Sequence, residues 1–158
     1  MRRISSIVLL SSLALAVGAA SPRMPDTYTE AEFARIAKFD AHVHANVEDP
    51  RFIEVARRDG FELLSINVDY PDFPPLAEQA TIAEAMRQRD PKRFHFATTF
   101  SMEGFGTPGW SAQAQRTIDA AVARGAVAVK VWKNIGMVAT DDKGKRVFID
   151  DARFDPVM

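Results

Sequence analysis

Apolar and polar residues alternate along most of this chain with two different periods. A period of two, typical of strands, marks residues 38–44, 61–69, 93–101 and 126–133. Between these segments a period near 3.6 predicts helices that begin after Asp49, after Pro75 and at Ser111. Alternating strands and helices imply right-handed crossovers, so we predict an α/β fold with about four parallel strands and intervening helices.

Residues at the ends of these segments agree with this division. Thr29 and Glu32 have the spacing of a capping box ahead of a short lead-in helix. Asp49 followed by proline is a typical helix start, and Gly60 is a typical helix end. Residues 141–144 indicate a turn between two short strands, so we expect a surface hairpin after the fourth strand.

Two architectures are compatible with four such strands: an open doubly wound sheet, and part of an eight-stranded barrel. A nucleotide-binding sheet would carry a glycine-rich phosphate loop after its first strand, but residues 45–48 contain no glycine. Polar residues near the strand ends favour a barrel instead, because the catalytic residues of barrel enzymes lie at the C-terminal rim. We therefore predict a partial (β/α)8 TIM-type barrel over residues 38–158, about half of a complete one.

The N-terminal 20 residues have the pattern of an export signal. Arg2 and Arg3 precede an apolar run over residues 4–17, and small residues follow it. The run is shorter than the ~20 residues that span a bilayer, which favours a signal peptide cleaved near Ala19 or Ala20 over a membrane anchor. We expect export to the periplasm or the medium, with residues 21–37 forming a linker and the lead-in helix.

The amino-acid composition excludes several kinds of ligand and partner. The chain has no cysteine, which excludes thiolate ligands and nucleophiles. Its formal net charge is -1, with acidic and basic residues mixed along its length. We expect no nucleic-acid partner and no polybasic membrane arm, and a small-molecule substrate is the partner that remains.

The first predicted strand ends in Asp40, His42 and His44, spaced two apart. Side chains two apart on a strand share one face, so we predict that all three point the same way. Neutral imidazole is a good zinc ligand, and His42 and His44 supply two of the roughly three protein ligands of a catalytic site. We expect Asp40 to lie beneath the two histidines on the strand, where its carboxylate packs against a ligand or bonds to it without binding the metal. The alternative is that the two histidines occur together by chance, or cap the strand, and bind no metal. We expect His95 in the core or in the lower part of the barrel.

Lys130 is the other candidate ligand. Three valines at residues 127, 129 and 131 are expected to face the helices, which sends Lys130 and Trp132 into the barrel. An unpaired buried ammonium is costly, so Lys130 should be paired, deprotonated or carboxylated to a metal-bridging anion. An ion pair with Asp69 and direct metal contact are equally open. Asp69 and Trp132 are expected to lie beside the substrate.

Residues 39–44 (FDAHVH) resemble the first-strand signature of the metal-dependent amidohydrolase superfamily, whose members fold as TIM-type barrels. Residues 125–137, with the hairpin and Asp150-Asp151 after them, resemble the fourth-strand region of exported bacterial members of the amidohydrolase-related branch. The resemblance spans the mature chain but covers only the family's N-terminal half. It implies that His42 and His44 bind the metal, and that Lys130 matches a lysine carboxylated in some branches.

This resemblance implies a fragment of an exported hydrolase that cleaves C–N or C–O bonds through metal-activated water, with zinc as the favoured divalent metal. The family's later histidines and its general-base aspartate would lie past Met158, so we expect the chain alone to bind metal weakly and to be inactive. A metal-dependent decarboxylase of the same superfamily and a non-catalytic exported metal-binding module are the alternatives. Uncovered barrel edges also predict self-association.

Overall fold

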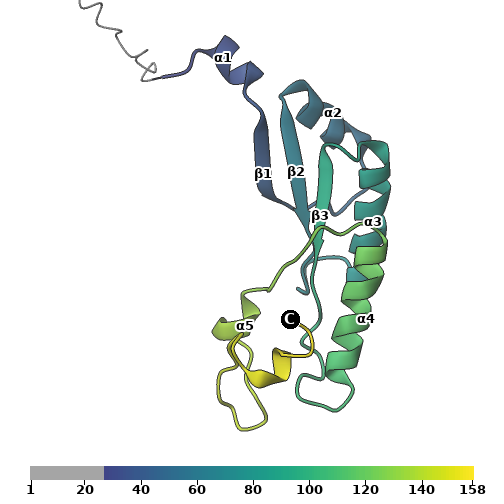
Figure 1. The fold of residues 1–158 in the computed structure, drawn as a ribbon, viewed down its shortest axis with the longest axis vertical. Coiled ribbons are helices and arrows are strands. Elements are labelled where there is room, and N and C mark those ends of the chain that lie inside the picture. The colour runs from purple at the N-terminus through teal and green to yellow at the C-terminus, as the bar shows by residue number, and fades with distance from the viewer. Residues whose placement is uncertain (1–26) are drawn as a thin grey trace, which may run out of the picture.

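The structure is a computed structural model that describes residues 27–158. Four parallel strands in the order β1-β2-β3-β4 curl into half of a barrel, with helices between them along the chain (Figure 1). The strands are β1 (Lys38–Val43), β2 (Phe61–Ile66), β3 (Phe94–Thr98) and β4 (Ala128–Val129). The helices are α1 (Glu30–Arg35), α2 (Pro50–Arg58), α3 (Leu76–Arg89), α4 (Trp110–Ala123), α5 (Asn134–Met137) and the 3-10 helix η1 (Ala152–Phe154). The α/β class and the parallel sheet are confirmed.

The predicted signal peptide, residues 1–20, lies outside the described residues, as does the first part of the predicted linker. Export therefore stays a prediction. Within residues 27–158, no helix combines the length and the apolar character needed to cross a membrane.

The predicted helix ends are present. The Thr29 hydroxyl accepts from the Glu32 N–H at 3.2 Å, and the Glu32 carboxylate accepts from the Thr29 N–H at 2.9 Å, which completes the capping box of α1. Asp49 caps α2 by accepting from the Arg51 N–H at 2.9 Å. Gly60 follows α2 with a φ of 73°, a left-handed conformation that glycine adopts without steric cost.

All four strands are shorter than predicted: β1 by one residue, and β3 covers Phe94–Thr98 rather than 93–101. β2 stops at Ile66 rather than at residue 69, and β4 comprises two residues rather than 126–133. After Ile66 the chain leaves the sheet because the backbone of Val68 pairs with the side chain of Gln79. β4 lies at the edge of the sheet and has β3 as its single neighbour, so hydrogen bonds from one side alone define it.

The two faces of the sheet carry different cores. On the outer face, β2 and β3 pack against α2 and α3 through Leu63, Phe94, Phe96, Ile53, Ala83 and Met86. On the inner face of the half-barrel, a smaller cluster contains Ile66, Val68 and Ala97, packed with Phe73 and Trp132. Burying a large apolar side chain contributes roughly 1.5–3 kcal/mol, so the outer face supplies most of the stability of the sheet.

The C-terminal tail carries the predicted turn and a third cluster. Thr140 and Arg146 form an antiparallel bridge, and the Asp141 carboxylate accepts from two backbone N–H groups of the turn. The predicted turn is present, but the two short strands are not: one isolated bridge takes their place. Beyond it the tail returns to the lower end of α4 (Figure 1). Apolar side chains pack there, namely Phe100, Trp110, Ala114, Val147 and Phe154.

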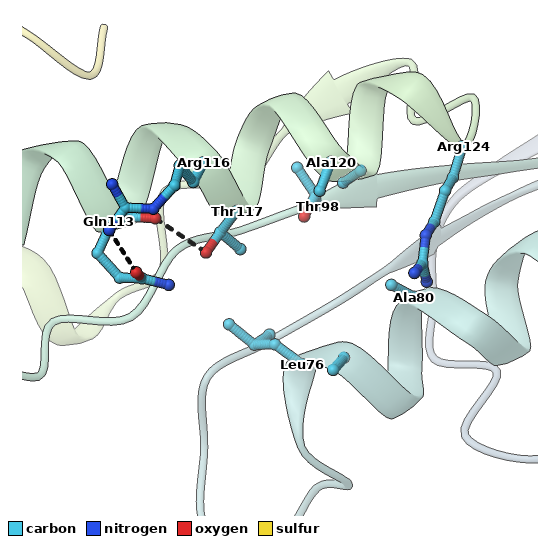
Figure 2. A pocket seen from close by; sticks show the side chains of 10 residues that line it. Leu76, Ala80, Thr98, Gln113, Arg116, Thr117, Ala120 and Arg124 are labelled. Atoms are coloured by element: carbon cyan, nitrogen blue, oxygen red, sulfur yellow. Dashed lines mark hydrogen bonds between the residues drawn. The ribbon is translucent and has the colours of Figure 1, made fainter.

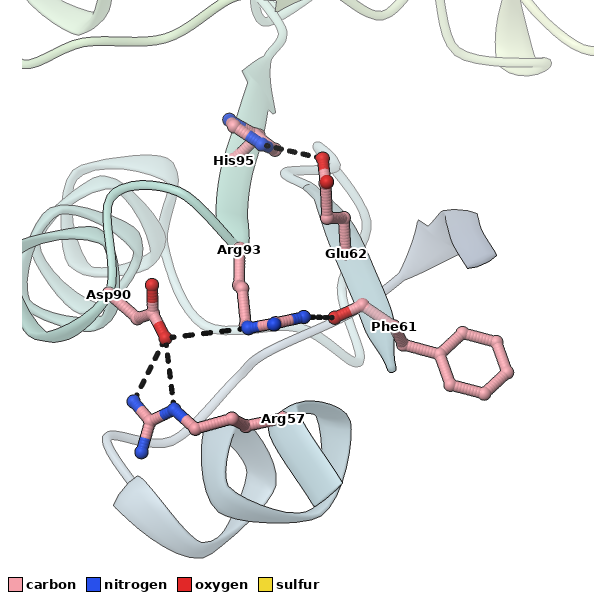
Figure 3. Close-up of polar contacts among 6 residues, drawn as sticks. All are labelled: Arg57, Phe61, Glu62, Asp90, Arg93 and His95. Atoms are coloured by element: carbon pink, nitrogen blue, oxygen red, sulfur yellow. Dashed lines mark hydrogen bonds and ion pairs between the residues drawn. The ribbon is translucent and has the colours of Figure 1, made fainter. Parts of the chain in front are cut away.

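Polar contacts hold the N-terminal end of the sheet. The Asp90 carboxylate accepts from Arg57 at 2.9 Å and lies 4.0 Å from Arg93 (Figure 3). The Arg93 guanidinium in turn donates to the Phe61 carbonyl oxygen at 3.4 Å. These contacts connect α2, the end of α3 and the first residue of β2 at the end of the sheet opposite the candidate site.

Candidate metal centre

His42 and His44 lie side by side at the C-terminal end of β1. Their Nε2 atoms are 3.2 Å apart, and the planes of the two rings meet at 75°. His42 is exposed and His44 is half-buried. The structure therefore brings the two predicted ligands together, with one nitrogen of each ring within hydrogen-bond distance of the other.

The orientation of His44 is fixed by a neighbouring strand. Its Nδ1 lies 2.7 Å from the carbonyl oxygen of Ile66, the last residue of β2. Because a carbonyl oxygen only accepts, Nδ1 carries the proton and the Nε2 of neutral His44 keeps its lone pair. A backbone carbonyl in this position is a common support for a metal-ligating imidazole.

The spacing of the two nitrogens fits a metal ion. Zinc–nitrogen bonds of about 2.0–2.1 Å in tetrahedral geometry hold two ligand nitrogens roughly 3.3 Å apart. The observed 3.2 Å agrees with that value. In the metal-free chain the same spacing accommodates one N–H···N hydrogen bond from His42 to His44. The separation of the two nitrogens is thus the one that zinc requires, and it is also that of a hydrogen bond between the rings.

Asp40 does not share the face of the two histidines, and that prediction is wrong. Asp40 pairs with Leu63 and Val43 pairs with Ser65, so a register shift lies between Asp40 and Val43. Leu63 and Ser65 are two apart and face the same way, which places Asp40 and Val43 together on the outer face. The Asp40 carboxylate accepts from the His42 N–H at 3.1 Å. Asp40 therefore shapes the bulge that presents the histidines, rather than lying beneath their rings.

Trp132 lies on the inner face, as predicted. It packs against the cluster that contains Ile66, Val68 and Ala97, and its ring centroid is 6.3 Å from that of Tyr70. Phe73 belongs to the same cluster, and its ring centroid is 5.0 Å from that of His44. Aromatic side chains thus form a wall next to the histidine pair.

Lys130 is half-buried directly after β4, where its carbonyl oxygen accepts from the Thr99 hydroxyl at 2.7 Å. Within residues 27–158 its ammonium makes no ion pair, so the alternative of a pair with Asp69 is not realised. Its role as a ligand stays a prediction. Within the same residues, no group of three histidine, aspartate or glutamate side chains is close enough to hold a metal ion.

Asp69 lies at the rim, in the loop after β2. It lines a hollow of about 380 Å³ together with Tyr70, Phe73, Ser101 and Glu103. Phe73 separates this hollow from His44, because its ring contacts one and lines the other. The hollow therefore lies on the far side of Phe73 from His44, and neither histidine lines it.

His95 is in the lower half of the half-barrel, as predicted. Its Nε2 is 3.7 Å from the Glu62 carboxylate (Figure 3). Its ring stacks on Phe39 with centroids 6.3 Å apart. His95 pairs with Leu64 in the middle of β2, and Glu62 is two residues earlier on that strand. This histidine lies three residues before the end of β3, below the rim.

Two residues that position the site had no signal in the sequence. The Ser65 hydroxyl accepts from the Ala45 N–H at 3.0 Å, directly after His44. The buried Gln79 side chain bonds both backbone groups of Val68. The period of two placed Ser65 on a strand, but its partner lies 20 residues away along the chain. Only a strand order that puts β2 beside β1 makes that contact predictable.

The loop from His44 to α2 ends in a strong electrostatic contact. The Arg51 guanidinium donates to both Asp49 carboxylate oxygens, and this lowers the pKa of Asp49 to about 2. The Arg51 backbone N–H adds to the same shift. Asp49 thus stays ionised at neutral pH and fixes the start of α2 five residues after His44.

A second hollow, of about 450 Å³, lies between α3 and α4 on the outside of the sheet (Figure 2). Its polar lining consists of Thr98, Gln113, Arg116, Thr117 and Arg124. It contains no histidine or carboxylate, and we therefore place the candidate site at the histidine pair.

Comparison of the chain with protein-family models, with curated proteins and with solved structures gave no match.

Proposed function

We propose that this chain forms the N-terminal half of an exported metal-dependent hydrolase of the amidohydrolase type, on a TIM-type barrel. His42 and His44 supply two ligands of a divalent metal ion, most readily zinc. The observation that supports this best is the 3.2 Å approach of their Nε2 atoms, with His44 held by the Ile66 carbonyl oxygen. His42 lies at the C-terminal end of the first strand of a curled parallel sheet and His44 directly after it, the end at which the catalytic residues of barrel enzymes lie.

When bound, the metal would lower the pKa of a water molecule and polarise a substrate carbonyl, for cleavage of a C–N or C–O bond. Residues of this chain position the groups that such a reaction would use. The Ile66 carbonyl oxygen keeps the Nε2 lone pair of His44 available, and Phe73 packs edge-on against that ring. The hollow beside Phe73 offers Asp69 to the polar groups of a small substrate.

Zinc titration of the full chain by calorimetry tests the metal site. We expect His42→Ala and His44→Ala each to weaken zinc binding at least tenfold, a loss consistent with removal of one direct ligand. His95→Ala is the matched control, because the chain has three histidines and His95 pairs with Glu62 away from the rim. It should bind zinc like the wild type.

Two results would overturn this proposal. Equal losses in all three variants would indicate unspecific binding to histidine, and unchanged binding in His42→Ala would place the ion elsewhere. Turnover is a separate readout. We expect none from the 158-residue chain with ester or amide substrates, so submicromolar zinc binding accompanied by hydrolysis would contradict the assignment of half a catalytic site.

A further inference from the structure

The pocket of about 450 Å³ between α3 and α4 is separate from the histidine pair (Figure 2). Its lining comes from three successive elements, α3, β3 and α4 with its C-cap, and β3 is an interior strand of the sheet. The pocket therefore does not depend on either edge of the sheet. Its volume and its mixture of an apolar surface with a few polar groups are typical of small-molecule sites.

Small side chains on the facing sides of the two helices leave this space open. The alanines that line it are Ala77 and Ala80 on α3, and Ala120 and Ala121 on α4. Both helices pack on β3 more than on each other. A single methyl group does not reach the opposite helix, so the middle of the pocket is apolar and unfilled.

An arginine lies at each end of the pocket. Figure 2 shows Arg116 at one end and Arg124 at the other, with Ala120 between them. Eight residues of α-helix separate the two backbone positions by about 12 Å along the axis. Among the described residues, no aspartate or glutamate lines the pocket. Its two ends are therefore positive and its middle is neutral.

Neither guanidinium is held in a close ion pair. Arg116 donates to the Gln113 side-chain oxygen at 2.7 Å, and no carboxylate in the part of the chain that the structure describes pairs with it. The Nε of Arg124 is 3.9 Å from the Glu84 carboxylate, and its Nη1 donates to the Thr81 hydroxyl at 3.4 Å. A guanidinium has five N–H donors and can bind a carboxylate through two of them. Both arginines therefore retain donors for a bound anion.

We propose that this pocket binds an elongated small molecule with an apolar middle and a carboxylate at each end, such as a straight-chain dicarboxylate. One carboxylate would accept from Arg116 and the other from Arg124. The methylene groups between them would cover Ala80 and Ala120, and so remove apolar surface from water. The proposal uses no residue of the metal centre and does not depend on the proposed hydrolase activity.

Other classes of ligand match the pocket less well. A metal ion needs carboxylate or imidazole ligands, and the described lining offers neither. A compact anion such as phosphate would meet one arginine and leave the apolar middle uncovered. A monocarboxylate with a long chain would fill the middle but leave the second guanidinium without an anion.

Calorimetric titration of the full chain with octanedioate, in the presence of a chelator, tests the proposal. We expect saturable binding of one molecule per chain, at least tenfold tighter than the binding of octanoate or butanedioate. Arg116→Gln and Arg124→Gln should each weaken the binding of octanedioate at least tenfold, because each removes charge-assisted hydrogen bonds. Arg35→Gln is the matched control, because Arg35 is exposed at the end of α1, and it should bind like the wild type.

A second pair of variants tests the apolar middle of the pocket. Ala120→Leu places a larger side chain in it and should abolish binding of octanedioate. Ala112→Leu is its control, because Ala112 is exposed on the same helix and does not line the pocket, and it should leave binding unchanged. Circular dichroism checks that both variants fold.

Several results would overturn the proposal. They are the absence of saturable binding to the wild type, equal affinities for octanedioate and octanoate, and equal losses in the Arg116, Arg124 and Arg35 variants. If a variant fails to fold, amide shifts of the wild type in NMR give a second measurement. On addition of octanedioate they should change most around this pocket, and changes centred elsewhere would contradict the assignment.

The metal centre supplies one further control. The His42→Ala, His44→Ala double variant should bind octanedioate like the wild type, since neither histidine lines the pocket. A loss of binding in this double variant would place the dicarboxylate at the histidines and overturn the proposal. The outcome at the pocket is thereby distinguished from the outcome of the zinc titration.

Discussion

The side chain of Gln79 bonds both backbone groups of Val68. Its Oε1 accepts from the Val68 N–H at 2.9 Å, and its Nε2 donates to the Val68 carbonyl oxygen at 2.8 Å. Gln79 is 1% exposed, so these bonds lie away from water. They connect the first turn of α3 to the end of β2, and the loop between these elements carries Phe73, which contacts His44.

We expect Gln79→Leu to lower the free energy of unfolding by about 2–4 kcal/mol, because it leaves two buried backbone groups of Val68 unpaired. Urea denaturation followed by circular dichroism measures this change. Gln88→Leu is the control on the same helix, because Gln88 is exposed and contacts Glu84 at its own surface. Equal stabilities of the two variants would show that the Gln79 contacts contribute little.

Ser65 positions the residue that follows His44. Its hydroxyl is buried and accepts from the Ala45 N–H at 3.0 Å. We expect Ser65→Ala to destabilise the chain by about 1–3 kcal/mol, since the Ala45 N–H loses its acceptor. We also expect zinc binding to weaken, because β1 and β2 would hold His44 less firmly. Ser111→Ala, in the first turn of α4, should leave zinc affinity unchanged. An equal loss of zinc affinity in this variant would show that Ser65 does not act by positioning His44.

Phe154 anchors the C-terminal tail. It is 1% exposed, and its ring centroid lies 4.9 Å from Phe105 and 5.5 Å from Trp110. We expect Phe154→Ala to cost about 3–5 kcal/mol, because it removes a buried aromatic ring and leaves a cavity. Trp110 should become more accessible, so its fluorescence maximum should shift to longer wavelength. Phe148→Ala, at a side chain 53% exposed, should change neither quantity.

The Asp49–Arg51 pair makes stability depend on pH. Because the pKa of Asp49 is lowered from 3.8 to about 2, its contribution is fully present above pH 3.8 and is lost as the pH falls through about 2. Asp49→Asn keeps a helix cap but removes the carboxylate. We expect the wild type to be more stable than this variant at neutral pH, and the difference to vanish below about pH 2. Carboxyl carbon shifts in NMR should give a midpoint near 2 for Asp49, whereas a midpoint near 3.8 would contradict the contact.

Local patterns in the sequence predicted local structure well. The capping box at Thr29, the start of α2 at Asp49 and the turn at Gly60 depend on residues a few positions apart, and all three are present. The approach of His42 and His44 followed in the same way from their spacing, because neighbours two apart on one strand meet at its end.

The position of Asp40 could not be predicted from the period of two. A register shift in β1 moves it to the outer face, and this shift depends on how β1 pairs with β2. The same is true of β4, whose length is set by the two positions at which it pairs with β3 and not by its own apolar residues. A pattern along one strand does not contain the pairing that decides such features.

The sequence by itself determined the alternation of strands and helices, the helix ends and the pair of histidines, because these depend on contacts within a few residues. The tertiary structure decided which strand carbonyl orients His44, which glutamine secures the loop beside it, and on which face Asp40 lies. The physical reason is that these contacts join residues far apart in the chain. The strand order selects them, and no local pattern records them.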